Sequence, residues 1–88
     1  MPENPQDERD LSALGRALHA LRIEHGLSAG ELAARSHTTL ERVHEIEAGE
    51  HDPSYDLLLA LAQAIGVKPV ALVNRAEELR SEDETEGR

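Results

Sequence analysis

Several side chains in this sequence are of types that bind metals or transfer protons. Three histidines, His37, His44 and His51, recur every seven residues, and imidazole is a common ligand of zinc. However, His37 falls in an expected turn and His51 in an expected loop, so the three are not expected to share a helical face. Many carboxylates lie in the two polar ends, which cannot hold the fixed geometry that acid–base catalysis requires. We therefore expect no metal site, no cofactor and no enzymatic activity.

Length and charge limit the remaining possibilities. The chain has 88 residues, enough for one small domain, and a formal net charge of −9. Residues 1–10 contribute −3 and residues 77–88 contribute −4, which leaves only −2 for the segment 11–76. There is no cysteine and no apolar run long enough to cross a membrane, so we expect a cytoplasmic protein without membrane contact.

The composition divides the chain into three parts. Both ends are polar, acidic and poor in apolar residues, which is typical of disordered segments. We expect a disordered N-terminal arm at residues 1–10 and a disordered acidic tail at residues 81–88. The folded domain is expected to span residues 11–80.

Within that domain, apolar residues recur at spacings of three and four, and no segment alternates with a period of two. This pattern predicts an all-α fold of five short helices. Leu11 begins the apolar stripe of the first helix, and Gly26 ends that helix as a left-handed cap. Ser28 and Glu31 have the spacing of a capping box at the start of the second helix, which ends near Arg35.

The third helix is predicted at about residues 39–48. Its buried side is expected to consist of Val43 and Ile46, helped by Leu40, and a threonine caps its start. Ser54 caps a fourth helix with a broad leucine-rich face. The fifth helix begins near a proline, which suits a first helical turn, and ends at about residue 80.

Several features of this pattern stand in one register along the chain. They are Arg22 ahead of Gly26-Leu27, the triplet Glu31-Leu32-Ala33, Val43 with Ile46-Glu47, Gly49, and Pro53-Ser54. With these features, residues 14–74 resemble the phage-repressor (Cro/C1, XRE) helix-turn-helix family, so the expected fold is a lambda-repressor-like domain. The resemblance implies that the protein is a transcriptional regulator that binds double-stranded DNA sequence-specifically. It also implies a supporting helix near residues 29–35 and a recognition helix, about residues 39–48, in the major groove.

The expected DNA contacts surround the second and third helices. They are Ser28, Ala29, Gly30, Thr39, Leu40, Glu41, Arg42, His44, Glu45 and His51. The start of the second helix offers backbone donors to phosphate, and Arg42 suits a phosphate or a guanine. The resemblance further implies that Arg22 pairs with Glu47 and so joins the first helix to the third.

Structural alternatives exist for these side chains. Thr39 is a helix cap, and Glu41 is favoured in a first helical turn by the helix dipole. Arg42 can pair with Glu45, three residues later on the same helix. Leu40 can contact a thymine methyl group, or instead complete the core or a protein interface.

The sequence also departs from the family pattern. Ala29 stands where the family often has a glutamine that contacts phosphate, and His37 stands where the turn usually has glycine. Within residues 28–54 the only formal cations are Arg35 and Arg42. Because affinity for DNA depends on the number of phosphates neutralised, a monomer is expected to bind weakly.

The fifth helix offers a way to strengthen that binding. Its apolar residues Val70, Val73 and Ala76 are expected to form a homodimer contact, although they can alternatively fold back on the first and fourth helices. A second hypothesis concerns the whole molecule. The chain can be a protein-interaction helix-turn-helix module, such as an antitoxin or a regulatory subunit, that does not bind DNA on its own and whose acidic face meets a basic protein partner.

Overall fold

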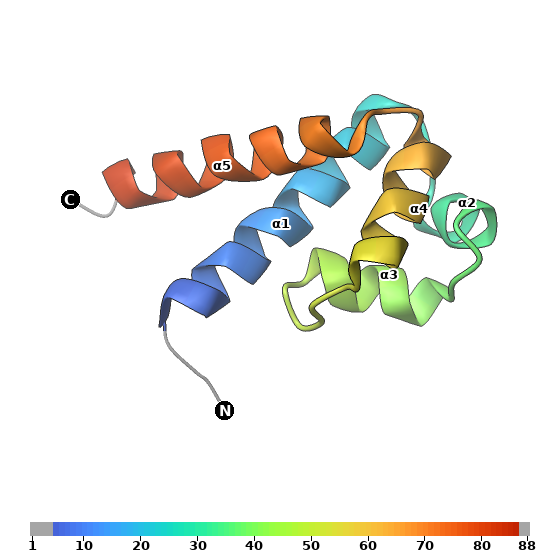
Figure 1. Cartoon of the computed structure of the whole chain (residues 1–88), viewed down its shortest axis with the longest axis horizontal. Helices are drawn as coiled ribbons and strands as arrows, with labels where there is room; N and C mark the ends of the chain where they lie inside the picture. Colours follow the sequence, from blue (N-terminus) through green and yellow to red (C-terminus); the bar gives the residue numbers. More distant parts are fainter. Residues whose placement is uncertain (1–4, 87–88) are drawn as a thin grey trace.

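Five helices make up the fold, and the part of the chain that the structure covers contains no strand (Figure 1). The computed structural model describes the backbone of residues 5–86 and the side chains of residues 10–82. The helices are α1 (Pro5–Glu24), α2 (Ala29–Arg35), α3 (Leu40–Glu47), α4 (Tyr55–Ile65) and α5 (Pro69–Glu86). The all-α fold of five helices is therefore confirmed.

The first and last helices extend beyond their predicted ends. Helix α1 starts six residues before Leu11, and α5 continues past residue 80. Residues 5–10 and 81–86, which were expected to belong to disordered ends, have helical backbone in the structure; residues 1–4 and 87–88 lie outside the described residues. Acidic residues are favourable in the first turns of a helix such as α1, and Asp10 there pairs with Arg80, the residue before the extension of α5, with Arg80 Nη1 3.0 Å from Asp10 Oδ1.

Local capping sets the bounds of the three central helices. Ser28 Oγ accepts a hydrogen bond from the Glu31 amide at 3.0 Å, and Glu31 Oε1 accepts one from the Ser28 amide at 2.8 Å. This is the predicted capping box of α2. Thr39 and Ser54 cap α3 and α4 by accepting from the amide three residues later. Gly66 ends α4 with a left-handed backbone at φ 96°.

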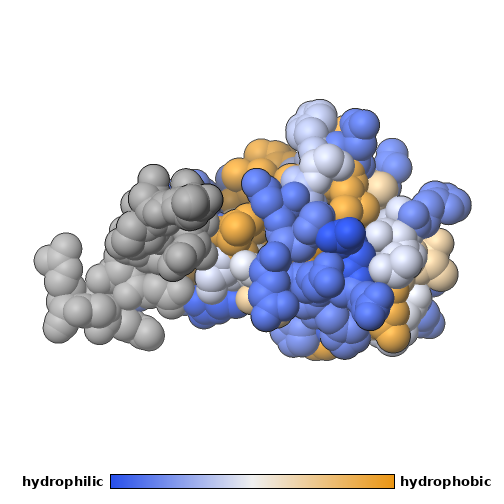
Figure 2. All heavy atoms as spheres, turned by 90° about the horizontal axis from the view of Figure 1, so that it is seen from below, coloured by the Kyte–Doolittle hydropathy of each residue, from blue (hydrophilic) through white to orange (hydrophobic). Residues whose placement is uncertain are grey.

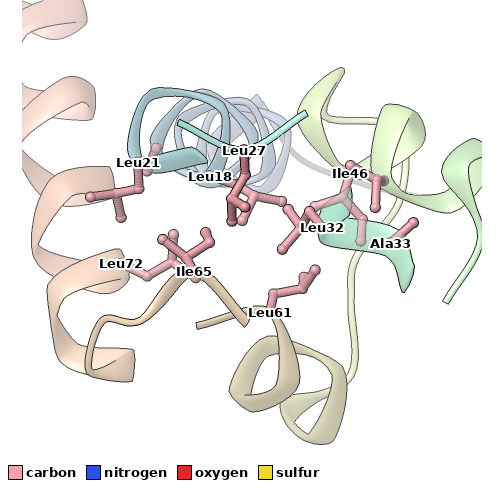
Figure 3. Packing of buried hydrophobic residues seen from close by; sticks show 11 residues of the cluster. Leu18, Leu21, Leu27, Leu32, Ala33, Ile46, Leu61, Ile65 and Leu72 are labelled. Carbon is pink, nitrogen blue, oxygen red and sulfur yellow. The ribbon is translucent and has the colours of Figure 1, made fainter. Parts of the chain in front are cut away.

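Every helix contributes to a single core (Figure 3). The fully buried side chains include one large aliphatic residue from each helix in turn: Leu18, Leu32, Ile46, Leu61 and Leu72. Because the core takes a residue from each of α1 to α5, each helix has one side fixed against the others. The opposite side of each helix is left for solvent or for a partner.

The first and last helices run antiparallel along one side of the molecule (Figure 1). At one end of their contact Arg75 Nη1 lies 2.7 Å from Glu24 Oε2, and at the other end Arg80 pairs with Asp10. Arg75 therefore pairs with the end of α1. None of the described helices is by itself long and apolar enough to cross a bilayer; only α4 and the start of α5 together, bent by 98°, have that length and composition.

Candidate nucleic-acid interface

Helix α3 has one buried and one open face. Val43 and Ile46 are fully buried, whereas the opposite side carries Leu40, Glu41 and His44. The open side lines a shallow groove with the residues Leu40, Glu41, His44, Glu45, Ala48 and Glu50. The face of the molecule on which α3 and the following loop lie is largely hydrophilic, with apolar atoms between the polar ones (Figure 2). A partner approaching from this side would meet the helix directly.

Leu40 occupies a different position from the one that the apolar pattern suggests. Its side chain is 49% exposed, so the prediction that it joins the buried side of α3 is wrong. Leu40 directly follows the cap residue Thr39 in the first turn of α3, and there it lines the groove with Glu41 and His44 instead of joining Val43 and Ile46 in the core. Leu40 is therefore an apolar group on the outer surface.

An ion pair between α1 and α3 holds the helix in this orientation. Arg22 Nε lies 2.7 Å from Glu47 Oε2, and Arg22 Nη2 lies 3.1 Å from Glu47 Oε1. This is the pair that the family resemblance implies. Arg22 is only 8% exposed, and its Nη1 donates a further hydrogen bond to the Leu27 carbonyl at 2.9 Å. The bidentate geometry fixes both the position and the angle of the end of α3.

A third side chain contacts the Arg22–Glu47 pair, and it was not predicted from the sequence. His19 Nδ1 lies 3.0 Å from both Glu47 Oε1 and Arg22 Nη2. Burial raises the pKa of Glu47, but the hydrogen bonds from Arg22 and His19 outweigh burial, so the pKa lies below its ordinary value. The hydrogen bond with Glu47 in turn raises the pKa of Arg22. Glu47 and Arg22 therefore remain charged at neutral pH. His19 sits three residues before Arg22, and this helical spacing was the one signal available in the sequence.

A second overlooked residue is Gly15 of α1. A Cβ atom at this position would lie 2.6 Å from the carbonyl oxygen of Glu47 and closer still to that of Ile46. Helix α1 can pack this closely on the end of α3 only because residue 15 has no side chain. The apolar pattern placed Gly15 within a helix but gave no reason for a glycine there.

The turn between α2 and α3 has an unusual backbone. His37 has φ of 60°, in the left-handed region where glycine is favoured. This is the position at which the family usually has glycine. Ser36 is buried beside it, and its hydroxyl donates to the Leu32 carbonyl at 2.6 Å. His37 therefore adopts a backbone conformation that favours glycine although it carries a side chain.

The residues predicted at the start of α2 lie on the surface. Ser28 and Gly30 are exposed and Ala29 is half-buried. The side chain of Ser28 is used in the capping box, and hydrogen bonds from Ser28 hold the pKa of Glu31 below its ordinary value. The carboxylate of Glu31 therefore already accepts the hydrogen bond of the Ser28 amide, one of the backbone donors at the start of α2.

Three of the predicted contact residues come together around one guanidinium. Arg42 Nη1 lies 2.6 Å from His51 Nδ1 and 3.2 Å from Glu45 Oε1. The structural alternative of an Arg42–Glu45 pair is thus present, and the loop histidine joins it. We call these three side chains the Arg42 cluster. Within the cluster a carboxylate offsets the charge of the arginine.

The predicted dimer residues of α5 divide into two groups. Val70 and Val73 are 56% and 50% exposed, whereas Ala76 is half-buried and packs against the core. Ala76 therefore packs on its own domain, as the alternative to a dimer contact predicts. A small groove beside it is lined by Asp10, Ala13, Leu14, Leu58, Val73, Ala76, Glu77 and Arg80.

Two short helices joined by a tight turn, with the second presenting an open face, define a helix-turn-helix protein. The family model described as "Helix-turn-helix domain" matches residues 13–76, so the chain belongs to this family.

Known proteins agree with this assignment. The chain is 37% identical over 65 residues to the uncharacterized HTH-type transcriptional regulator y4dJ of Sinorhizobium fredii (strain NBRC 101917 / NGR234), covering 74% of this chain and 84% of the relative. The clp gene regulator ClgR from Corynebacterium glutamicum superimposes with a TM-score of 0.87 at 26% identity, covering 89% of this chain and 83% of that one. The restriction-modification controller protein C.AhdI from Aeromonas hydrophila superimposes with a TM-score of 0.70 at 35% identity, covering 72% and 96%.

Proposed function

We propose that the exposed face of α3 enters the major groove of double-stranded DNA and reads base edges there. The protein is a DNA-binding transcriptional regulator of the helix-turn-helix family. The observation that carries the proposal is the orientation of α3: its inner side is buried, its end is held by the Arg22–Glu47 pair, and its first two turns are open. An α-helix fits the major groove in this way.

In this arrangement the residues of α3 have distinct roles. Leu40 contacts a thymine methyl group, and Glu41 accepts a hydrogen bond from the amino group of a cytosine. His44 and Glu45 lie one turn further along the same face and contact neighbouring bases or phosphates. Thr39 caps the helix and also lies at the groove edge, next to the backbone.

Contacts to phosphate come from the flanks of α3. Arg42 and His51 lie at one flank, and the start of α2, at Ser28, Ala29 and Gly30, lies at the other.

The acidic surroundings weaken non-specific binding, because few phosphates are neutralised. Specific binding therefore depends on a homodimer, in which two copies of α3 contact two half-sites. Val70 and Val73 of α5 are the proposed dimer contact, with Ala76 at its inner edge. The proposal involves no catalytic step or cofactor, and it places the protein in the cytoplasm.

One observation favours a second function. The open face of α3 carries Glu41 and Glu45, followed by Glu50, and the one cation on this helix is already paired. A basic protein segment matches this surface better than a polyanion does. The second proposal is therefore a protein-interaction module that does not bind DNA by itself.

Selection of duplexes from a random pool, at two salt concentrations, tests the first proposal. The proposal requires recovery of a consistent half-site and weaker binding of the recovered duplex by Arg42→Ala. Arg16→Ala is a matched control, because it removes an exposed arginine from α1 and not from α3. Failure of the folded dimer to bind any duplex at low salt would support the second proposal. Unchanged binding by Arg42→Ala would show that the docking position is wrong.

A further inference from the structure

The first turn of α3 presents two different groups side by side. Leu40 is 49% exposed, and Glu41, the next residue, is exposed as well. Both side chains line the shallow groove over the open face of the helix. Thr39 Oγ1 accepts a hydrogen bond from the Arg42 amide at 3.0 Å, which fixes the backbone of this turn. An apolar group and a carboxylate are therefore held next to each other on the surface.

Neither side chain has a partner within the domain. Among residues 10–82, whose side chains the structure describes, no group forms a hydrogen bond or an ion pair with the carboxylate of Glu41, whereas Glu45 pairs with Arg42. Leu40 does not pack against the core cluster. The carboxylate is thus an unused hydrogen-bond acceptor beside an uncovered apolar group. A ligand that complements both needs a hydrogen-bond donor next to a small apolar group.

None of the four standard bases offers this combination in the major groove. Cytosine has the N4 amino donor but no methyl group, and thymine has the C5 methyl group beside an O4 acceptor that a carboxylate repels. Adenine and guanine present the N7 acceptor and no methyl group. In 5-methylcytosine the amino donor is on C4 and the methyl group is on C5, which are adjacent ring atoms. This base therefore matches the two neighbouring side chains.

We propose that Leu40 and Glu41 together read 5-methylcytosine, with Glu41 accepting from the N4 amino group and Leu40 contacting the C5 methyl group. This inference rests on the proposed function, because it assumes that the first turn of α3 faces base edges. In unmethylated DNA the two groups come from separate bases, a cytosine and a thymine. Methylation places both groups on the one base that Glu41 already contacts.

The charge of the surface increases the weight of such a contact. Because few phosphates are neutralised, base contacts supply a larger share of the affinity. Burial of one methyl group against Leu40 is expected to tighten binding about fourfold for each half-site. Methylation adds no phosphate contact, so the slope of log K against log salt should stay the same.

The test measures affinity by fluorescence anisotropy for the duplex recovered by selection, with each cytosine of the half-site replaced in turn by 5-methylcytosine. At one position the wild-type protein should bind about fourfold more tightly after the replacement. Leu40→Ala should lose most of this gain. Glu41→Ala should lose the preference for 5-methylcytosine over thymine at that position, because the two bases carry the same methyl group and differ in the group that Glu41 contacts.

Ile23→Ala is the control, because it removes an aliphatic side chain that is 55% exposed from α1 and not from α3, and it should keep the wild-type gain. Circular dichroism checks that each variant is folded. The proposal is overturned if the wild-type protein gains no affinity from methylation at any cytosine of the half-site. It is also overturned if folded Leu40→Ala keeps the full gain.

These outcomes are distinct from a failure of the proposed function. A protein that binds the unmethylated duplex but gains nothing from methylation still reads DNA, and only the inference about Leu40 and Glu41 is lost. Selection is also carried out with a pool synthesised with 5-methylcytosine in place of cytosine. If neither pool yields a duplex, the proposed function is overturned together with the inference.

Discussion

Glu47, at the end of α3, receives two parallel hydrogen bonds from Arg22 of α1, which lies 25 residues earlier in the chain. Both side chains are about nine-tenths buried, and the guanidinium also donates to the Leu27 carbonyl. The pair therefore connects α3, the proposed recognition helix, to the longest helix of the domain. Its geometry determines the angle at which the open face of α3 is presented.

Glu47→Ala should strongly destabilise the protein. The change leaves the guanidinium of Arg22 buried without its carboxylate, and breaking a buried pair in this way costs about 3–5 kcal/mol. Urea unfolding followed by circular dichroism measures the loss. Glu45→Ala is the control: it breaks the exposed pair with Arg42 and should cost less than about 1 kcal/mol. Equal effects from the two changes would show that the Arg22–Glu47 pair does not stabilise the fold.

The same carboxylate makes stability depend on pH. The pKa of Glu47 is lowered in the folded protein from its ordinary value of 4.5, so its stabilising contribution is present above pH 4.5. That contribution is lost as the pH falls below 4.5 through the folded-state pKa. Urea unfolding at a series of pH values should show this decline. Glu47→Gln should show a smaller decline but not a flat profile, because the pKa values of Glu24 and Glu31 are also lowered. A decline of the same size in both proteins would contradict the assignment.

Gly15→Ala should destabilise the protein even though alanine favours helices. The added methyl group would overlap the carbonyl oxygens of Ile46 and Glu47, which are backbone atoms and cannot turn aside. Overpacking of this kind costs about 1–3 kcal/mol, so α1 and α3 must move apart. Thermal unfolding should show a lower Tm.

Gly30→Ala is the matched comparison, since the nearest atom to its added methyl group is Ser28 Oγ at 3.9 Å. Helix propensity should stabilise this variant by up to about 1 kcal/mol. A Tm for Gly15→Ala at or above that of the wild-type protein would show that the close contact is absent in solution.

The dimer proposal predicts that Val70→Asp combined with Val73→Asp yields a monomer. Both valines are at least half exposed, so the changes should leave the core and the helical content intact. Sedimentation equilibrium measures the mass, and circular dichroism checks the fold. DNA affinity should fall together with the dimer, because one protomer contacts only one half-site. Tyr55→Asp, at an exposed aromatic residue of α4, is the control and should leave the mass unchanged. A double variant that stays dimeric would place the interface elsewhere.

Features that depend on nearby residues were predicted well from the sequence. The capping box of Ser28 and Glu31, the cap at Thr39 and the left-handed glycine at position 26 each involve groups within a few residues of one another. The buried positions Val43 and Ile46 followed from helical spacing alone. The Arg22–Glu47 pair spans α1 and α3 and was expected only from the family resemblance.

Features that depend on distant residues were not predictable in this way. Residues 5–10 and 81–86 lack an apolar pattern, and the contact of Asp10 with Arg80 spans 70 positions. The need for glycine at position 15 arises from the carbonyl oxygens of another helix. The bond from Arg42 to His51 depends on the path of the loop after α3, for which the sequence offers no periodic signal.

The antiparallel contact of α1 with α5 bears on how the protein is made. Leu72 completes the core and Arg80 meets Asp10, so the first helix stays uncovered until α5 has been translated and has left the ribosomal tunnel. During that interval the apolar side of α1 is accessible to chaperones and proteases. A polypeptide that lacks α5 (Pro69–Glu86) would therefore be left without a closed fold.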